Sequence, residues 1–258
     1  MTPEVLWSFG RIGNVSVSPD GSKAVYDITY FNKEEDRGYS DLYLMNLPEG
    51  QTTRLTDTDY NESDAGWTPD GKFITYLAKG QLWEMNPDGS NPRQVTDIPD
   101  GINGYVYAPD MSKIVYLKDV QLEPTVQDLY PDLPKAKARI VDDQFYRHWN
   151  DWVDAYTHLF IADYVPAQPI TTGKDIMEGE RWESPVRPWG GVEQLAWTKD
   201  GKKLIYTCRK KIGIDYAEST NTDLYAYNTE NGETVNLTEG MMGYDKNPVI
   251  SPNGRYMA

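Results

Sequence analysis

Residues 18–26 are Ser-Pro-Asp-Gly-Ser-Lys-Ala-Val-Tyr, a tight turn followed at once by a stretch that alternates in polarity. Proline presets the backbone for the turn, aspartate accepts local backbone hydrogen bonds, and glycine supplies a positive φ. The same design returns at 68–71, 108–111, 198–201 and 251–254, so its second position falls at 19, 69, 109, 199 and 252. Steps of 50, 40, 90 and 53 residues indicate a repeat rather than a single hairpin.

Two further strands recur in the repeat. One strand carries a central leucine, at 41–44, 81–84, 158–161 and 223–226, and the next ends at 54–57, 94–97 and 236–239. Four antiparallel strands every 40 to 50 residues predict an all-β fold, a β-propeller of WD40-like, four-stranded blades. The alternative is a generic antiparallel sandwich, which does not need the same turn in every unit.

The repeat predicts about four blades and the start of a fifth. The blades lie roughly at 12–57, 62–97, 102–172 and 192–239, with a fifth started at 245–258. We therefore expect residues 1–258 to be the N-terminal part of a propeller domain. Such a piece leaves bare blade faces, for the first blade on the side of Val15, Val17 and Val25, and bare apolar faces favour a homo-oligomer.

The step of 90 residues predicts one enlarged blade, with an insertion at about 119–157 in blade three. Apolar side chains recur in this insertion at steps of 4, 4, 3, 1 and 3, which is typical of a helix. The partly helical insertion either packs against the propeller or lines a ligand site. Its stripe is formed by Val141, Phe145, Trp149, Trp152, Val153 and Tyr156.

Composition excludes several partners and cofactors. The chain has 40 acidic against 25 basic residues and a net charge of −15, which argues against nucleic acid and membrane surfaces as partners. No apolar run exceeds four residues, such as Leu159–Ala162, whereas a membrane helix needs about 18. There is one cysteine, and neither a metal-ligand spacing nor a glycine-rich phosphate loop, so we expect no cofactor and no metal.

Several segments resemble a known family. These are Thr2-Pro3-Glu4 with Arg11-Ile12, and the stretches 128–133 (DLYPDL), 139–143 (RIVDD), 147–152 (RHWNDW) and 220–224 (TNTDL). Together they resemble the propeller of prolyl-oligopeptidase-family serine peptidases, in the branch of acylaminoacyl-peptidase and dipeptidyl-peptidase V. The resemblance implies a propeller that precedes an α/β-hydrolase domain and restricts the access of peptide substrates to a Ser-Asp-His triad.

The catalytic domain itself is not expected in these residues. None of the 11 serines lies in Gly-x-Ser-x-Gly, the turn that exposes a hydrolase nucleophile, and there are only two histidines, His148 and His158. We therefore expect no catalytic residue here, and a C-terminal hydrolase domain as partner in the full-length peptidase. The alternative is a non-catalytic, TolB-like propeller that binds a protein or peptide.

Candidate substrate-binding residues come from two loops. Glu34 and Glu35 are paired carboxylates, the groups with which dipeptidyl peptidases hold the ammonium of a peptide. Arg147, His148 and Trp149 belong to the blade-three insertion. The alternatives are a solvated loop for the first pair and a packed loop for the second group. The opening Met1–Glu4 shows no signal peptide; the resemblance implies a periplasmic or secreted protein, and a cytoplasmic location stays open.

Overall fold

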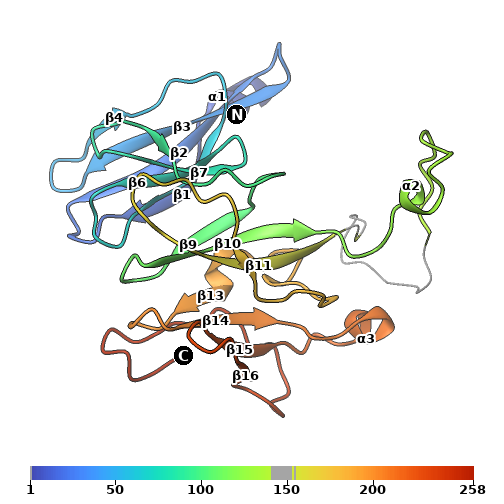
Figure 1. Ribbon diagram of the computed structural model, residues 1–258. Helices are drawn as coiled ribbons and strands as arrows, with labels where there is room; N and C mark the ends of the chain where they lie inside the picture. Colours follow the sequence, from blue (N-terminus) through green and yellow to red (C-terminus); the bar gives the residue numbers. More distant parts are fainter. Residues whose placement is uncertain (1, 141–152, 154) are drawn as a thin grey trace. The chain divides into compact units, whose positions relative to one another are not determined.

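The computed structural model describes residues 2–140, 153 and 155–258 (Figure 1). The described strands form four four-stranded antiparallel sheets, each built from consecutive strands. The predicted all-β propeller class with four-stranded blades is confirmed. The strands of the four sheets are, in order, β1 (Arg11–Val17), β2 (Lys23–Asn32), β3 (Arg37–Asn46) and β4 (Gln51–Arg54); β5 (Glu62–Trp67), β6 (Ile74–Ala78), β7 (Gln81–Met85) and β8 (Arg93–Gln94); β9 (Gly104–Tyr107), β10 (Lys113–Val120), β11 (Tyr156–Asp163) and β12 (Lys174–Asp175); β13 (Leu195–Trp197), β14 (Lys203–Cys208), β15 (Asp223–Asn228) and β16 (Thr234–Asn236).

Helices are short. The first, α1 (Pro3–Ser8), has Thr2 as its N-cap and proline at its start, residues that favour a helix N-terminus, and all its residues are exposed. Helix α2 (Val126–Leu129) lies in the blade-three insertion and begins with a capping box formed by Thr125 and Asp128. Helix α3 (Gly213–Glu218) connects β14 to β15, and the 3-10 turn η1 (Val192–Gln194) precedes β13.

The helical stripe predicted for the insertion lies largely outside the described residues, so a helical stripe there stays a prediction. The predicted fifth blade also stays a prediction. Residues 245–258 contain one antiparallel bridge, between Ile250 and Met257, around the last copy of the repeated turn.

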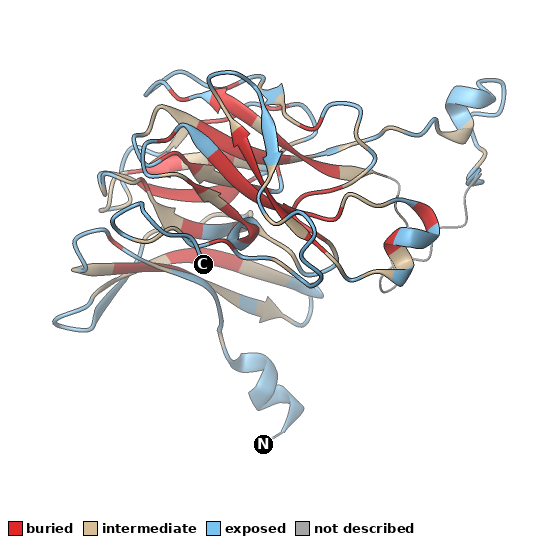
Figure 2. Ribbon diagram, turned by 90° about the horizontal axis from the view of Figure 1, so that it is seen from below, coloured by how far each residue is buried: buried red, intermediate tan, exposed pale blue. Residues whose placement is uncertain are grey.

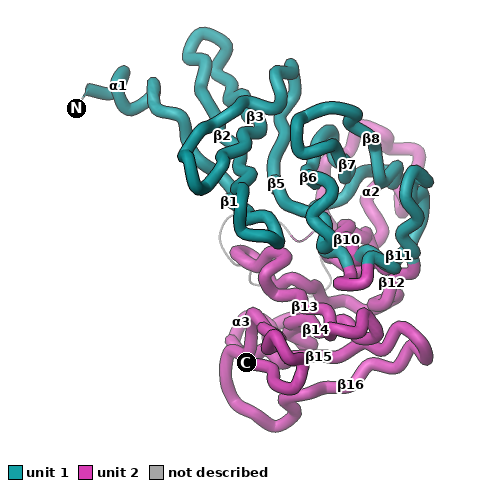
Figure 3. The backbone as a smooth tube through the Cα atoms, turned by 90° about the vertical axis from the view of Figure 1, so that its left-hand side faces the viewer, with its two compact units in different colours: residues 1–107, 111–114, 162–173 teal, residues 108–110, 115–161, 174–258 magenta. Residues whose placement is uncertain are grey.

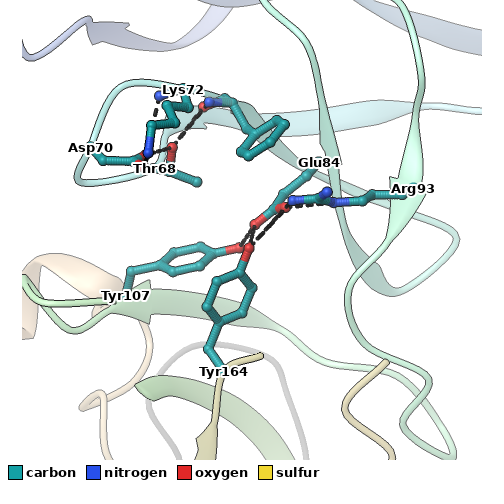
Figure 4. Close-up of polar contacts among 8 residues, drawn as sticks. Thr68, Asp70, Lys72, Glu84, Arg93, Tyr107 and Tyr164 are labelled. Carbon is teal, nitrogen blue, oxygen red and sulfur yellow. Dashed lines mark hydrogen bonds and ion pairs between the residues drawn. The ribbon is translucent and has the colours of Figure 1, made fainter. Parts of the chain in front are cut away.

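The repeated turn is closed by its own side chains. In the first copy the Ser18 hydroxyl donates to Asp20 Oδ1 at 2.6 Å and accepts from the Lys23 N–H at 3.0 Å. Thr68 and Asp70 repeat this pattern in the second sheet (Figure 4). Hydrogen bonds from Ser18 and Ser22 lower the pKa of Asp20 to about 2, so the carboxylate keeps its acceptors at neutral pH.

The chain divides into two compact units (Figure 3). Unit 1 comprises Met1–Tyr107, Met111–Ile114 and Ala162–Gly173, and unit 2 comprises Ala108–Asp110, Val115–Ile161 and Lys174–Ala258. Buried residues are concentrated in the strands (Figure 2). In unit 1 the first two sheets share a core of Val25, Leu42, Ala65, Ile74, Tyr76, Ala78 and Met85, and in unit 2 a smaller cluster consists of Ile205, Leu224 and Ala226.

Unit 1 also contains a buried charge, the fully buried Glu84 of β7. Arg93 donates to Glu84 Oε2 through Nε at 2.9 Å and Nη2 at 2.5 Å (Figure 4). The hydroxyl groups of Tyr107 and Tyr164 donate to Oε1 at 2.5 and 2.9 Å. Both carboxylate oxygens therefore have donors, which is the condition under which a buried carboxylate is tolerated.

The bare face of the first blade is smaller than the sequence predicts. Val15 and Val17 of β1 are 55% and 54% exposed, and Ile12 is 64% exposed. Val25 is fully buried and packs in the core shared with the second sheet, so its assignment to the bare face was wrong. The reason is the alternation of a strand: Val25 pairs with Ser16 rather than with a valine of β1, and therefore points to the other face.

The turn design predicts opposite effects of two substitutions. Gly21 has a φ of +73° and nothing within 4 Å of an added Cβ, whereas the third copy places Met111 at a φ of +58°. We expect G21A to lower the free energy of unfolding by about 1–2 kcal/mol and M111G to raise it by about 0.5–1 kcal/mol, because only glycine adopts this conformation without strain. Urea unfolding measures both, and equal signs would contradict the strain argument.

The exposed side chains of β1 predict self-association. We expect the 258-residue chain to be a dimer or larger, and replacement of Ile12, Val15 and Val17 by threonine to give a monomer. Light scattering coupled to size exclusion measures the mass. A parent chain that runs as a 29.4 kDa monomer would refute the prediction.

Candidate functional site

The predicted carboxylates Glu34 and Glu35 lie in the connection between β2 and β3, and both are exposed. The backbone N–H groups of both residues donate to Asn32 Oδ1, at 3.0 and 3.3 Å. The Tyr39 hydroxyl donates to Glu35, and this hydrogen bond raises the pKa of Tyr39. Glu35 is thus held by its own hairpin, while Arg147, His148 and Trp149 lie outside the described residues. A role of these five residues in substrate binding stays a prediction.

A second group of charged residues, which we call the Arg187 cluster, lies in unit 2 at the base of the blade-three insertion. It consists of Asp119 at the end of β10, Thr157 at the start of β11, and Glu183 and Arg187 in the link between β12 and β13. Arg187 Nη2 donates to Asp119 Oδ1 at 3.1 Å and to Thr157 Oγ1 at 3.0 Å. Thr157 in turn donates to Asp119 Oδ1 at 2.6 Å.

Glu183 is the buried member of this cluster, with a side chain that is 8% exposed. Its Oε1 accepts hydrogen bonds from the Tyr216 hydroxyl at 3.0 Å and the Arg187 N–H at 3.3 Å, and its Oε2 lies 3.4 Å from Arg187 Nε. Burial raises the pKa of Glu183, against the opposing effect of the Arg187 guanidinium. Arg187 itself is 40% exposed, so the cluster connects a buried carboxylate to the surface.

The segment after Arg187 is a tight loop. The Gln194 side chain accepts from the Val186 N–H at 2.8 Å, and the Gly190 N–H donates to the Val186 carbonyl at 3.0 Å. A Cβ on Gly190 would lie 2.4 Å from that carbonyl oxygen, so only glycine fits there. This loop presents Trp189, whose surface is 77% exposed.

His158 has a structural role. It is fully buried in β11, with Nδ1 2.8 Å from Asp175 Oδ2 and Nε2 3.0 Å from the Glu180 carbonyl oxygen. A carbonyl oxygen can only accept, so Nε2 carries a proton and is not available as a base. His158 is therefore not the histidine of a hydrolase triad.

Beside His158, Lys210 binds Glu180 at 3.1 Å and lies over the rings of Trp182 and Tyr225, at 5.3 and 4.7 Å from their centroids. This ammonium is already satisfied by a carboxylate and two aromatic faces. Across the described residues there is no group of three or more side chains that could hold a metal ion. In the same part of the chain no helix is long and apolar enough to cross a membrane.

Sequence reasoning missed the Arg187 cluster because its members are 38, 26 and 4 residues apart along the chain. Two of them, Glu183 and Arg187, lie between the predicted blades three (102–172) and four (192–239). One local signal was available, the Pro188-Trp189-Gly190-Gly191 sequence, which places a tryptophan in a turn rather than in a strand.

No protein-family profile matches the chain. The chain is 42% identical over 261 residues to dipeptidyl-peptidase 5 of Porphyromonas endodontalis, and 41% identical over 262 residues to dipeptidyl-peptidase 5 of Porphyromonas gingivalis. The predicted family resemblance is confirmed. Both alignments cover 100% of this chain and 38% of the relative, whose N-terminal part is the part matched.

Two solved structures agree in fold. Acylaminoacyl peptidase of Pyrococcus horikoshii matches with a TM-score of 0.61 at 16% identity, over 91% of this chain and 33% of that chain. TolB of Acinetobacter baumannii matches with a TM-score of 0.53 at 16% identity, over 96% of this chain and 48% of that chain. At these identities the likeness establishes the propeller fold. The relatives of high identity favour the peptidase propeller over the TolB-like alternative.

The two acidic groups described above predict opposite pH dependences. Because the pKa of Glu183 is raised in the folded state, its contribution to stability is present below the unfolded-state pKa, about 4.3, and is lost as pH rises through the folded value. Because the pKa of Asp20 is lowered to about 2, its contribution is present above the unfolded-state pKa and is lost as pH falls toward 2.

We therefore expect the free energy of unfolding of E183Q to increase relative to that of the parent chain as pH rises from 4 to 7. For D20N we expect the same relative increase as pH falls over the acidic range. Urea unfolding at several pH values measures both differences. Parallel pH profiles of the two variants would contradict the assignment.

Proposed function

We propose that these residues form the N-terminal propeller portion of a serine exopeptidase that removes dipeptides or acylated residues from peptides. The observation that carries the proposal is the 42% identity to a dipeptidyl-peptidase 5 across the whole of this chain. Since the chain spans 38% of that relative, the reaction is proposed for the whole protein to which these residues belong. The hydrolase residues of that protein are expected outside residues 1–258.

The role proposed for this portion is to control substrate access and to bind the peptide amino terminus. Glu34 and Glu35 supply anionic acceptors on an exposed hairpin, and the Tyr39 hydroxyl orients Glu35. An ammonium prefers such charge-assisted acceptors to water when it is partly desolvated. The net charge of −15 attracts cationic amino termini from a distance and makes their association sensitive to salt.

We further propose proteolysis in the periplasm or outside the cell. The support for this location is the resemblance to the dipeptidyl-peptidase V branch, which implies a periplasmic or secreted protein. Fractionation of the source cells with an antibody against this chain measures the compartment, and recovery with the cytoplasmic fraction alone would refute the proposal.

The proposed function is tested by kinetics on the whole protein. For a dipeptidyl substrate with a free amino terminus, we expect E34Q and E35Q each to raise KM about tenfold with little change in kcat, because a bond made equally in substrate and transition state acts on KM. N-acylated substrates should show no change. The 258-residue chain alone should show no turnover, because it contains no Gly-x-Ser-x-Gly.

E49Q is the matched control. Glu49 is exposed and belongs to the same sheet, but it lies in the connection between β3 and β4, at the other end of the hairpin from Glu34 and Glu35. If E49Q raises KM as much as E35Q, the effect is general electrostatics. If neither hairpin variant changes KM, the amino terminus is bound elsewhere.

A further inference from the structure

The protein binds two nitrogens of the Arg187 guanidinium, Nη2 and Nε, and leaves Nη1 without a hydrogen-bond partner among the described residues. Nη2 donates to Asp119 and Thr157, and Nε lies 3.4 Å from Glu183 Oε2. In the part of the chain that the structure describes, Nη1 has no hydrogen-bond partner, and the side chain is 40% exposed. An arginine whose torsions are already fixed loses little entropy when Nη1 donates to a ligand.

The charge balance of the cluster decides which ligand atom suits Nη1. Asp119 and Glu183 place two carboxylates against the one guanidinium, so with both ionised the cluster carries a net negative charge. A further carboxylate would be repelled at this distance, whereas a neutral carbonyl oxygen accepts a hydrogen bond without that penalty. The geometry therefore favours a peptide carbonyl over a carboxylate.

Trp189 follows two residues later on the tight loop from Val186 to Gln194. Trp189 is 77% exposed. The next residue, Gly190, lies so close to the Val186 carbonyl oxygen that no side chain fits there. A tryptophan held by a rigid backbone offers a large apolar contact at low entropic cost, which is why tryptophan and arginine are enriched at binding hot spots. Two residues span at most about 7 Å, the distance from one side chain to the next on the same face of an extended peptide.

We propose that Arg187 and Trp189 form a peptide subsite, in which Arg187 Nη1 donates to a main-chain carbonyl and Trp189 contacts an apolar side chain. The inference rests on the proposed function, since it names residues that select among peptide substrates. Asp119, Thr157 and Glu183 act as positioning residues that hold the guanidinium. The ligand is an extended peptide with an apolar residue and needs no charged terminus.

The test uses probes without an amino terminus, so that it does not depend on amino-terminus binding at Glu34 and Glu35. The probes are acetyl-Gly-Phe-Gly-amide, acetyl-Gly-Gly-Gly-amide and sodium acetate. The chain has eight tryptophans, and the indole N–H signal of Trp189 in a nitrogen-15 spectrum is identified by its loss in W189F. We expect a saturable shift of this signal with the phenylalanine peptide, at least tenfold weaker binding of the glycine peptide, and no saturable shift with acetate.

Variants separate the two halves of the subsite. R187M should weaken binding of the phenylalanine peptide at least tenfold. K202M is its matched control, because Lys202 is also exposed and paired with a carboxylate, Glu230, and should bind as the parent does. W189A should lose saturation transfer to the phenylalanine ring protons. If R187M does not fold, R187K retains a cation beside Asp119 and Glu183 and should still bind more weakly.

Three results would overturn the proposal. They are a Trp189 signal that does not shift in the folded chain, equal binding of the phenylalanine and glycine peptides, and parent-like binding by a folded R187M or R187K. None of these results alters the KM changes expected for E34Q and E35Q with a substrate that has a free amino terminus. A failure of the subsite is therefore distinguishable from a failure of the proposed function.

Discussion

The repeated turn between the first two strands of a blade is the constraint on which the rest of the fold depends. A hydroxyl at its first position and a carboxylate at its third tie the turn to itself and to the start of the second strand, as Ser18 and Asp20 do. Register in a hairpin follows from its turn, and a slip of one residue would move every buried side chain to solvent. The Asp20 pKa of about 2 shows that these bonds favour the ionised carboxylate. Each sheet can thus form from a short stretch of chain before it packs on its neighbour.

This locality explains what the sequence could predict. Turn residues and strand alternation lie within a few positions of each other, so the repeat of four-stranded blades was readable from the chain, although β12 (Lys174–Asp175) lies beyond the predicted end of blade three at 172. Contacts between distant segments were not. Val25 was assigned to the wrong face because the pairing of β1 with β2, which places Ser16 rather than a valine opposite Val25, cannot be read from either strand alone. Glu84 lies in the middle of a strand, and its donors Tyr107 and Tyr164 are 23 and 80 residues away.

The two buried glutamates Glu84 and Glu183 differ in how their carboxylate oxygens are hydrogen-bonded. Glu84 has donors on both oxygens and is fully buried, so its charge is balanced inside unit 1. Removing a donor from such a buried carboxylate lowers the free energy of unfolding. The hydrogen bonds of Glu84 therefore stabilise the packing of the segments that carry its donors. Glu183 has hydrogen bonds on one oxygen, and its other oxygen faces the Nε of Arg187. Its charge fixes an arginine that is 40% exposed and whose Nη1 has no hydrogen-bond partner among the described residues.

The acidity of the chain and the short-range contacts of the proposed subsite act at different distances. Charge–charge attraction extends over about 8 Å at physiological ionic strength, so a net charge of −15 affects which peptides arrive but does not distinguish their sequences. A hydrogen bond from Arg187 and an apolar contact with Trp189 act only on contact, and depend on the shape and polarity of the residue presented. If long-range charge set the selectivity, salt would change which peptide is preferred. With selection made at Arg187 and Trp189, salt changes the rate of arrival and leaves the preference between two equally charged peptides unaltered.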